Sequence, residues 1–366
     1  MPADIGSDFE LVDPRWLVDG DNMPPWLRGC KPSNAQYFES GRQALAAAAI
    51  QLGADGRRVL LLPDHFCDSM VEPFISLDWK IGLLPVGDDL QLQPGFIGSS
   101  VRKPTETVIL HAPYFGRQGS AEVIDELRDA EAAGAAVVVD ETHSWFSGPS
   151  VLGQLRIASL RKMLPLADGA YLIGSPLVTD VGPTSGAASL RREAMSKKSQ
   201  FLRGETAARQ HLELFRKAES VTEACSEPRR MSEYSRRLIR KLDYAGISAR
   251  RRQNARAFFS TLSDRSSFRP ITTSFERNDW TPSHVVLSGV NVSGLRKALI
   301  NQRIYCPIHW PPSRLLQPTH PWPSKYISMP VDHRYDPEDM KRMAMAVNEF
   351  TAASTDDQTA AGSDAE

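Results

Sequence analysis

The chain has 366 residues, of which 41% are hydrophobic and 24% are charged, and its formal net charge is −1. This length exceeds what one small core needs, so we expect one large domain and one smaller one. The near-neutral charge gives no general attraction to nucleic acid or to an anionic membrane, and no apolar run is long enough to span a bilayer. The composition therefore predicts small-molecule partners, with no nucleic acid and no membrane among them.

The N-terminus and the cysteines indicate the compartment. The first residues, MPADIGSDFE, carry acidic side chains and no basic segment followed by an apolar run, so they do not form a secretory signal. Cys30, Cys67, Cys225 and Cys306 lie far apart and show neither CxxC nor zinc-type spacing. Such cysteines are typical of reduced thiols, so we expect a cytoplasmic protein with no metal site.

The first half of the chain predicts an α/β domain. Residues 1–34 are punctuated by Pro and Asp and are expected to form an N-terminal arm over the surface. From Ser40 onward, helices and strands alternate: helices at 40–53, 69–77 and 121–133, and strands ending at Pro63 and covering 80–84, 107–112 and 136–140. Because the strands are mostly continuous apolar runs, they predict a mostly parallel central sheet with helices on both faces, in a large domain over residues 35–242.

The second half predicts a smaller α+β domain over residues 243–351. Short strand-like pieces at 170–173 and 177–179 precede a long polar helical region at 190–240. Strands are expected at 284–287, 304–308 and 326–329, and helices at 295–302 and 337–350. The tail, residues 352–366, has almost no large apolar side chains and is expected to be disordered.

Two further features have a structural and a functional interpretation. The stretch Arg236–Arg256 carries eight Lys or Arg residues, and its interleaved apolar positions indicate a solvated face of a helix that joins the domains rather than a nucleic-acid surface. His309 and Trp310 follow a predicted strand and either border a pocket or pack in the core.

Asp140 and Lys162 are the first candidates for chemistry. Asp140 ends the apolar strand VVVD, and ligands of open parallel sheets bind at the carboxyl ends of strands. His143 follows in the loop, and Lys162 lies in the apolar segment ASLRKML. A partly buried lysine has a lowered pKa, so its amine can attack an aldehyde, and a carboxylate opposite would keep a pyridinium nitrogen protonated. Taken singly, the Asp is equally well a turn cap and the Lys a solvated loop residue.

A phosphate cradle is the third candidate feature. The helix that starts at Ser40, Gly41 and Arg42 presents free backbone N–H groups and the positive end of its dipole, and Ser159 can add a hydroxyl. Phe66 lies just past a strand end and can stack on an aromatic ring. Each has a simpler interpretation, because Ser-Gly at a helix start is often only a cap and a phenylalanine often only packs in the core.

With these motifs in place, the chain resembles the DegT/DnrJ/EryC1/StrS-type sugar aminotransferases within the fold type I enzymes that use pyridoxal 5'-phosphate (PLP). The resemblance covers about residues 37–350 and keeps the family's order of motifs. It rests on SGRQAL (40–45), LLPDHFCDSM (61–70), VVVDETHSW (137–145), ASLRKMLPLADGA (158–170), RRMSEYSRRLI (229–239) and SMPVDHRYDPEDM (328–340).

The resemblance implies a role for each candidate residue. Lys162 would hold PLP as a Schiff base and move a proton, and Asp140 would pair with the pyridine nitrogen. His143 stands where the family usually has Gln near the phenolic oxygen. The remaining matches are the stacking aromatic Phe66 and the phosphate-binding positions Gly41, Arg42 and Ser159, with Arg42 replacing a common Thr.

Two departures from the family pattern leave the substrate open. The family's Asn that reaches the neighbouring subunit's phosphate is missing, and Arg229 or Arg230 can replace it in an expected homodimer. The common Gly-Glu-Gly-Gly loop is replaced by LPLADGA.

The leading hypothesis is transamination from an amino acid donor, glutamate or glutamine, to a keto acceptor. By resemblance the acceptor is a sugar, often nucleotide-linked. The altered loop around Pro165–Asp168 motivates the alternatives of decarboxylation, elimination or condensation on an amino acid. A third hypothesis is a regulatory, non-enzymatic protein of the same fold.

Overall fold

The computed structural model describes residues 4–148, 150, 152–175, 180–271, 280–317 and 324–363, with side chains described up to residue 352. The chain forms two units, a large one of Asp8–Tyr244 with Trp310–Trp322 and a small one of Met1–Ser7, Ala245–His309 and Pro323–Glu366. The described residues 310–317 therefore belong to the large unit, although we predicted them in the small domain. The strand-like piece predicted at 177–179 lies outside the described residues.

A seven-stranded sheet organises the large unit. Its order is β2-β8-β7-β6-β5-β3-β4, and the pairs from β7 to β4 are all parallel. Within this sheet, β8 is antiparallel to both of its neighbours, β2 and β7. The bounds are β2 (Ala35–Phe38), β3 (Val59–Pro63), β4 (Lys80–Leu84), β5 (Thr107–His111), β6 (Ala136–Asp140), β7 (Leu155–Ser159) and β8 (Ala170–Ile173). The predicted mostly parallel sheet is confirmed.

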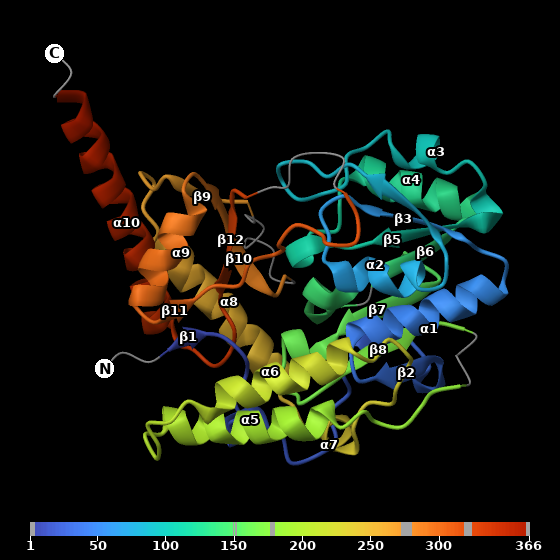
Figure 1. Ribbon diagram of the computed structural model, residues 1–366, viewed down its shortest axis with the longest axis horizontal. Helices are drawn as coiled ribbons and strands as arrows, with labels where there is room; N and C mark the ends of the chain where they lie inside the picture. The colour runs from blue at the N-terminus through green and yellow to red at the C-terminus, as the bar shows by residue number, and fades with distance from the viewer. Residues whose placement is uncertain are drawn as a thin grey trace. The chain divides into compact units, whose positions relative to one another are not determined.

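Helices cover both faces of this sheet. Figure 1 shows α3 (Ile97–Ser100) and α4 (Ala121–Ala132) on one side of β3, β5 and β6, with α1 (Gly41–Ala54) on the other. Val123 and Leu127 of α4 pack against Ile109 and Val137 of the sheet. On α1, Ser40 is the N-cap and accepts a hydrogen bond from the backbone N–H of Gln43 at 3.3 Å, so the helix starts where its sequence signal predicts.

Three helices occupy the predicted polar helical region. They are α5 (Ala187–Leu202), α6 (Gln210–Glu223) and α7 (Glu233–Leu238), while α2 (Asp68–Ile75) follows β3. Short 3-10 turns complete the unit: η1 (Pro14–Trp16), η2 (Pro25–Leu27), η3 (Pro32–Asn34), η4 (Pro104–Glu106), η5 (Tyr114–Gly116), η6 (Glu141–His143), η7 (Trp145–Ser147) and η8 (Leu160–Lys162).

Residues 8–34 are more than a surface arm. Trp26 is fully buried and stacks on Tyr171 of β8, with ring centroids 5.6 Å apart, and meets Trp145 edge to face at 5.0 Å. Burying an indole against other aromatic rings removes a large apolar area from water. This segment is therefore part of the core of the large unit, which its Pro- and Asp-rich composition concealed.

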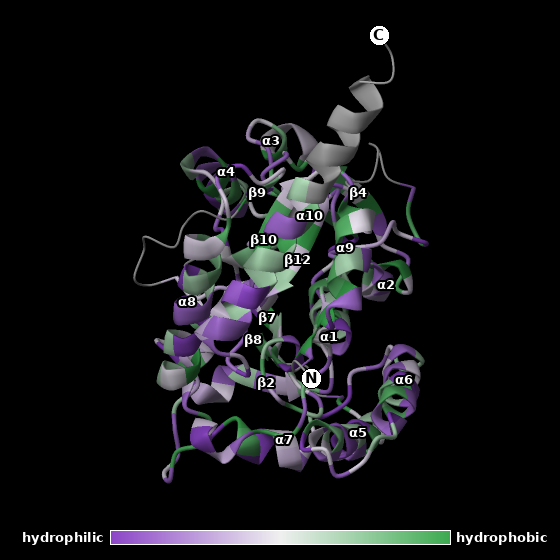
Figure 2. Ribbon diagram, turned by 90° about the vertical axis from the view of Figure 1, so that its left-hand side faces the viewer, coloured by the Kyte–Doolittle hydropathy of each residue, from purple (hydrophilic) through white to green (hydrophobic). Residues whose placement is uncertain are grey.

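The small unit has its own sheet and core. Strands β9 (Phe268–Pro270), β10 (His284–Gly289) and β12 (Tyr326–Pro330) form an antiparallel sheet, and β1 (Ile5–Gly6) pairs in parallel with β11 (Ile304–Tyr305). Helices α8 (Tyr244–Thr261), α9 (Val292–Asn301) and α10 (Pro337–Ser363) accompany them. Figure 2 shows β10 and β12 largely hydrophobic, as expected of strands in a core.

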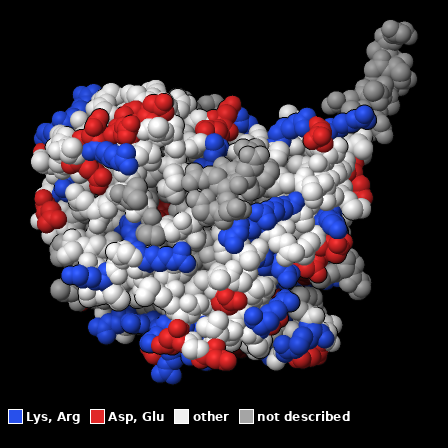
Figure 3. Space-filling view, turned by 180° about the vertical axis from the view of Figure 1, so that it is seen from behind, with Lys and Arg blue, Asp and Glu red and all other residues white. Residues whose placement is uncertain are grey.

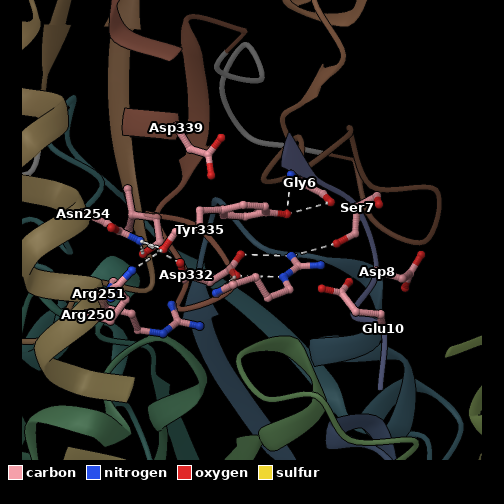
Figure 4. Close-up of polar contacts among 12 residues, drawn as sticks. Gly6, Ser7, Asp8, Glu10, Arg250, Arg251, Asn254, Asp332, Tyr335 and Asp339 are labelled. Atoms are coloured by element: carbon pink, nitrogen blue, oxygen red, sulfur yellow. Dashed lines mark hydrogen bonds and ion pairs between the residues drawn. The ribbon is translucent and has the colours of Figure 1, made fainter. Parts of the chain in front are cut away.

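Polar contacts tie the N-terminal strand to the small unit (Figure 4). The Tyr335 hydroxyl accepts from the Gly6 N–H at 2.7 Å and donates to the Gly6 carbonyl at 3.1 Å. Arg334 donates to both oxygens of Asp332 and to the carbonyl of Ser7. Burial alone would raise the pKa of Asp332, but Arg334 and Arg251 together hold it well below its usual range. The motif at 328–340 therefore has a structural role.

The basic stretch at 236–256 is divided between two helices and is only partly solvated. Arg251 on α8 is fully buried and donates to the carbonyls of Pro282 and Ser283, each at 3.2 Å. The predicted solvated face was wrong at this residue, because backbone carbonyls replace water around its guanidinium. On the face drawn in Figure 3, Lys and Arg side chains are interspersed with Asp and Glu.

The end of the chain differs from the sequence prediction. The last helix, α10, continues to Ser363, beyond its predicted end at residue 350 and into the tail that we expected to be disordered. The alanines of this tail favour helix and allow the backbone to continue without large apolar side chains.

Among the residues that the structure describes, none of the helices has both the length and the apolar run that a membrane crossing needs.

A buried ion pair joins three strands of the large sheet. Arg156 on β7 donates to Glu141, which directly follows β6, at 3.0 and 3.3 Å, and both side chains are less than a tenth exposed. Tyr171 on β8 donates to the same carboxylate at 2.6 Å. Arg156 also donates to the carbonyl of Trp26 and to Cys30. Strand β7 was missed in the sequence because this charged residue interrupts its apolar pattern.

We predict that Arg156→Met lowers the free energy of unfolding by about 3–5 kcal/mol, because it leaves the buried carboxylate of Glu141 without its counter-charge. Urea unfolding followed by tryptophan fluorescence measures this. The matched control is Arg237→Met, which removes an exposed pair with Glu233 on α7 and is expected to cost less than about 1 kcal/mol. Equal stability of the two variants would contradict the prediction.

Candidate functional site

All of the predicted site residues except Phe66 line one cavity of the large unit, with a volume of about 580 Å³. Its wall is formed by the start of α1, the start of α2, the carboxyl ends of β5, β6 and β7, part of α6, and residues 310–315. The lining residues named in the sequence analysis are Ser40, Gly41, Arg42, Asp140, His143, Ser159, Lys162 and Trp310. This volume lies within the range of small-molecule sites.

Lys162 ends the 3-10 turn η8 that follows β7. It lines the cavity, and its side chain is exposed rather than partly buried as we predicted. Its ammonium makes no hydrogen bond and no ion pair with the described residues. The amine is therefore accessible from the cavity. The argument that partial burial makes this lysine reactive does not apply to it.

Asp140 lies at the carboxyl end of β6 and is fixed by Thr142. Its Oδ1 accepts from the Thr142 backbone N–H at 3.0 Å and from the Thr142 hydroxyl at 2.5 Å. Thr142 Oγ1 in turn accepts from the Ser159 N–H at 3.0 Å, which links the ends of β6 and β7. Burial raises the pKa of Asp140 despite these bonds and the nearby charge of Lys162. Its Oδ2 accepts no hydrogen bond from any residue described.

The start of α1 faces Ser159. A Cβ added at Gly41 would lie 3.2 Å from the Cβ of Ser159, so a larger residue would crowd this approach. Arg42 lines the cavity, but its Nε pairs with Glu72 at 3.2 Å and its Nη1 donates to the Glu223 carbonyl at 3.0 Å. The backbone N–H groups of the first turn therefore remain the donors that this helix end offers to an anion.

His143 belongs to an aromatic group beside the cavity. Its ring stacks on Phe115, with centroids 4.8 Å apart, and on Trp310, at 5.9 Å. The Phe115 N–H points to His143 Nδ1 at a long 3.5 Å. Phe115 has a φ of 54°, a strained value for a bulky residue, and such strain is concentrated at functional sites.

Phe66 does not take part in this group. Its side chain is fully buried and is absent from the cavity lining, so a stack of Phe66 on a ligand ring has no support in this structure. Full burial of a phenylalanine is favourable by about 1.5–3 kcal/mol, which explains its place in the core. Tyr114, His143 and Trp310 supply the aromatic wall instead.

Residues 310–315 are the part of the site that sequence reasoning largely missed. Trp310 packs on Tyr114 with centroids 5.0 Å apart, and Asp68 at the start of α2 accepts from the Ser313 hydroxyl at 2.5 Å and from the Arg314 N–H at 3.1 Å. His309 lies in the small unit, where its Nδ1 is 2.7 Å from Ser328 Oγ. The one sequence feature that pointed to this segment was the position of Trp310 after a predicted strand. No sequence feature indicated the hydrogen bonds to Asp68.

A cluster of charged residues forms another wall. Arg161 Nη2 donates to both oxygens of Glu219 on α6, at 2.9 and 3.0 Å, and Arg191 Nη2 donates to the same carboxylate at 2.7 Å. Burial by itself would raise the pKa of Glu219, but Arg161 and Arg191 together lower it. Sequence spacing did not indicate this cluster, because its members come from a turn and two helices.

Two further predicted regions lie away from the cavity lining. Residues 163–168 are all buried, and Asp168 accepts from the N–H and hydroxyl of Ser232, each at 2.6 Å. Arg229 donates to Cys225 and to the Pro183 carbonyl, whereas Arg230 is exposed.

No family model matches the sequence, and no curated protein matches it either. Solved structures do match the fold over most of the chain. PseC of Helicobacter pylori, an aminotransferase involved in the biosynthesis of pseudoaminic acid, is 12% identical, with 96% of this chain and 100% of that chain covered and a TM-score of 0.63.

Two further structures show the same likeness. A DegT DnrJ EryC1 StrS aminotransferase from Brucella abortus is 12% identical, with 87% and 86% of the two chains covered and a TM-score of 0.55. A protein of Streptococcus pneumoniae solved in its PLP form is 12% identical, with 96% and 99% covered and a TM-score of 0.60. At these identities the likeness concerns the fold, and the predicted fold type I architecture is confirmed.

The partly buried carboxylate of Asp140 leads to a prediction on stability. Because its folded pKa is raised, ionisation of Asp140 costs stability as the pH rises through that pKa. Asp140→Asn keeps the Oδ1 that Thr142 binds and removes the charge. We therefore expect the ligand-free variant to unfold at higher urea than the parent at pH 7. This advantage shrinks as the pH falls and vanishes near the unfolded-state pKa of about 4.

Asp125→Asn is the control for this measurement, because Asp125 is exposed on α4. A variant at Asp140 that is less stable than the parent at pH 7 would contradict the prediction.

Proposed function

We propose that the protein is a PLP-dependent aminotransferase that attaches its cofactor to Lys162. The observation that carries this proposal is the meeting of Asp140 and Lys162 in one cavity. A partly buried carboxylate with a raised pKa and an uncommitted oxygen stands near an accessible amine. A cofactor that brings both an aldehyde and a protonatable ring nitrogen suits these two groups together.

The residues present fit such a cofactor at its phosphate end as well. The N-terminus of α1 approaches Ser159 so closely that a Cβ at Gly41 would crowd it, and this leaves backbone N–H groups and a hydroxyl facing the cavity. Helix N-termini of this kind bind phosphate. Ser40, whose hydroxyl caps the helix, keeps this first turn in place.

When bound, PLP supplies an electron sink that allows a bond at the α-carbon of an amino acid to break. The protein's own residues then have separate tasks. Asp140 would hold a proton on the ring nitrogen, Lys162 would hold the aldehyde carbon and carry a proton, and His143 would donate to the phenolic oxygen. Tyr114 and Trp310 would keep water from the site.

For the reaction we propose transfer of an amino group from glutamate or glutamine to a keto group, with a sugar or a related biosynthetic intermediate as acceptor. The support is the ordered set of motifs shared with sugar aminotransferases and the fold shared with PseC, which acts in the biosynthesis of pseudoaminic acid. The loop that motivated other reaction types, residues 165–168, is buried away from the cavity, so no observation favours them.

We further propose a cytoplasmic homodimer. All four cysteines are free, which suits a reducing compartment. Pro228 stands at the position of the family's phosphate-binding Asn. Arg230, two residues further on, is exposed, so it is the candidate that reaches the partner's cofactor. Light scattering is expected to give twice the chain mass of 40.5 kDa, and a monomer that is fully active at high dilution would contradict the dimer.

The cofactor proposal is tested by absorbance. Titration with PLP is expected to give the visible band of lysine-bound cofactor, and glutamate or glutamine without acceptor is expected to remove this band. Lys162→Ala should bind PLP without the band and lose essentially all amine transfer. Lys217→Ala is the control, because Lys217 is exposed on α6 and pairs only with Glu213 among the described residues.

Three outcomes would count against the proposal: no band in the parent protein, a band retained in Lys162→Ala, or a loss of CO₂ or another leaving group from the amino acid in place of amine transfer.

A further inference from the structure

Arg161 is a cavity residue for which the proposed chemistry has no task so far. It precedes Lys162 in η8, lines the cavity, and its side chain is 17% exposed. An arginine carries five N–H donors in a fixed plane. Here Nη2 bonds to Glu219, Nε is buried with no acceptor among the described residues, and Nη1 bonds to none of these residues. Most of its bonding capacity is therefore unused.

Arg161 shares its carboxylate partner with a second arginine. Arg161 and Arg191 both bond to Glu219. Arg191 has further partners, since its Nε donates to the Ala167 carbonyl at 3.1 Å and the charges of Asp8 and Asp168 lie nearby. Burial and then Arg161 lower the pKa of Arg191 to about 10. The two guanidinium groups thus repel each other, and an additional anion beside Arg161 would be stabilised.

The contacts of Arg161 separate it from the phosphate cradle. Ser159, Arg161 and Lys162 all line the cavity, but Ser159 and Arg161 contact different elements. Ser159 faces Gly41, whereas Arg161 faces Glu219 on α6. Arg161 is therefore next to the reactive amine but directed to a different wall from the start of α1.

Arg42, another arginine of the cavity lining, is already committed. Arg42 bonds to both Glu72 and the Glu223 carbonyl. Planar guanidinium groups match carboxylates particularly well, as the contact of Arg161 with Glu219 shows. A carboxylate is also the group that every amino acid donor carries one bond away from its reacting carbon.

We propose that Arg161 binds the carboxylate of the amino acid donor and that Glu219 is the positioning residue that orients it. This inference rests on the proposed function, because it names the group that selects the donor of that reaction. The site then distinguishes amino acids from plain amines through one charged side chain adjacent to Lys162.

The test compares donors with and without the charge. The PLP-loaded protein is mixed with L-glutamine or with its α-amide, and the loss of the visible band is measured as a second-order rate constant. In the parent, the amide is expected to react about 10- to 100-fold more slowly, the range of one charge-assisted contact. In Arg161→Gln this preference should fall to within about threefold, and Arg161→Lys should restore part of it. Arg216→Gln, on the exposed side of α6, should keep the preference.

A binding measurement gives a readout besides turnover. Glutarate, which has carboxylates and no amine, is titrated calorimetrically into the PLP-loaded protein. Its affinity should fall at least about tenfold in Arg161→Gln, while the affinity for PLP stays within about twofold. The PLP titration of the variant also reports whether it is folded. If Arg161→Gln does not fold, the same measurement is made on Arg161→Lys.

The outcomes separate the two proposals. An equal preference for glutamine over its α-amide in the parent and in Arg161→Gln overturns this inference and leaves the proposed aminotransferase function standing. The inference is also overturned if the preference for the donor over its amide is lost only in Arg314→Gln, at another cavity arginine. It is overturned as well if Arg161→Gln loses affinity for PLP. Arg161-dependent glutarate binding in a protein that no amino acid converts overturns the proposed function and keeps the carboxylate site.

Discussion

The buried pair of Glu141 and Arg156 is the interaction on which the arrangement of the site depends. Glu141 directly follows Asp140, and Arg156 lies on the strand that ends at Ser159, so their contact aligns the ends of β6 and β7. Tyr171 extends the contact to β8. Because a buried charge without its partner is costly, the pair admits few alternative strand arrangements. The carboxylate and the lysine turn are thereby brought to the same cavity.

Buried charge has two different uses in the large unit. Glu141 accepts hydrogen bonds at both of its carboxylate oxygens and serves the fold, whereas Asp140, at the cavity, accepts them from the described residues at Oδ1 alone. Arg161 resembles Asp140 in this respect, since most of its donors have no acceptor among the described residues. An incompletely satisfied charged group costs stability, and such groups are typical of sites that complete their bonding with a ligand. The contrast separates structural from functional ionisable residues.

The small unit has a compact polar network of a structural kind. Tyr335 binds both backbone groups of Gly6, and Arg334 satisfies Asp332 with two hydrogen bonds. These contacts close the parallel pair of β1 and β11, which would be too short to hold by itself. The DHRY segment, one of the motifs behind the family resemblance, therefore fixes the N-terminal strand of the chain.

The sequence by itself determined the alternation of elements, the carboxyl-end position of Asp140 and the helix start at Ser40, because apolar periodicity and capping are local properties. Only the tertiary structure decided that Phe66 is buried, that Trp310 lines the cavity, and that Arg161 meets Glu219. These contacts join residues far apart in the chain, and no local pattern encodes which of two apolar or charged side chains reaches a partner. Strand β7 shows the same limit, since the charge of Arg156 is compatible with a buried strand only once Glu141 is in place.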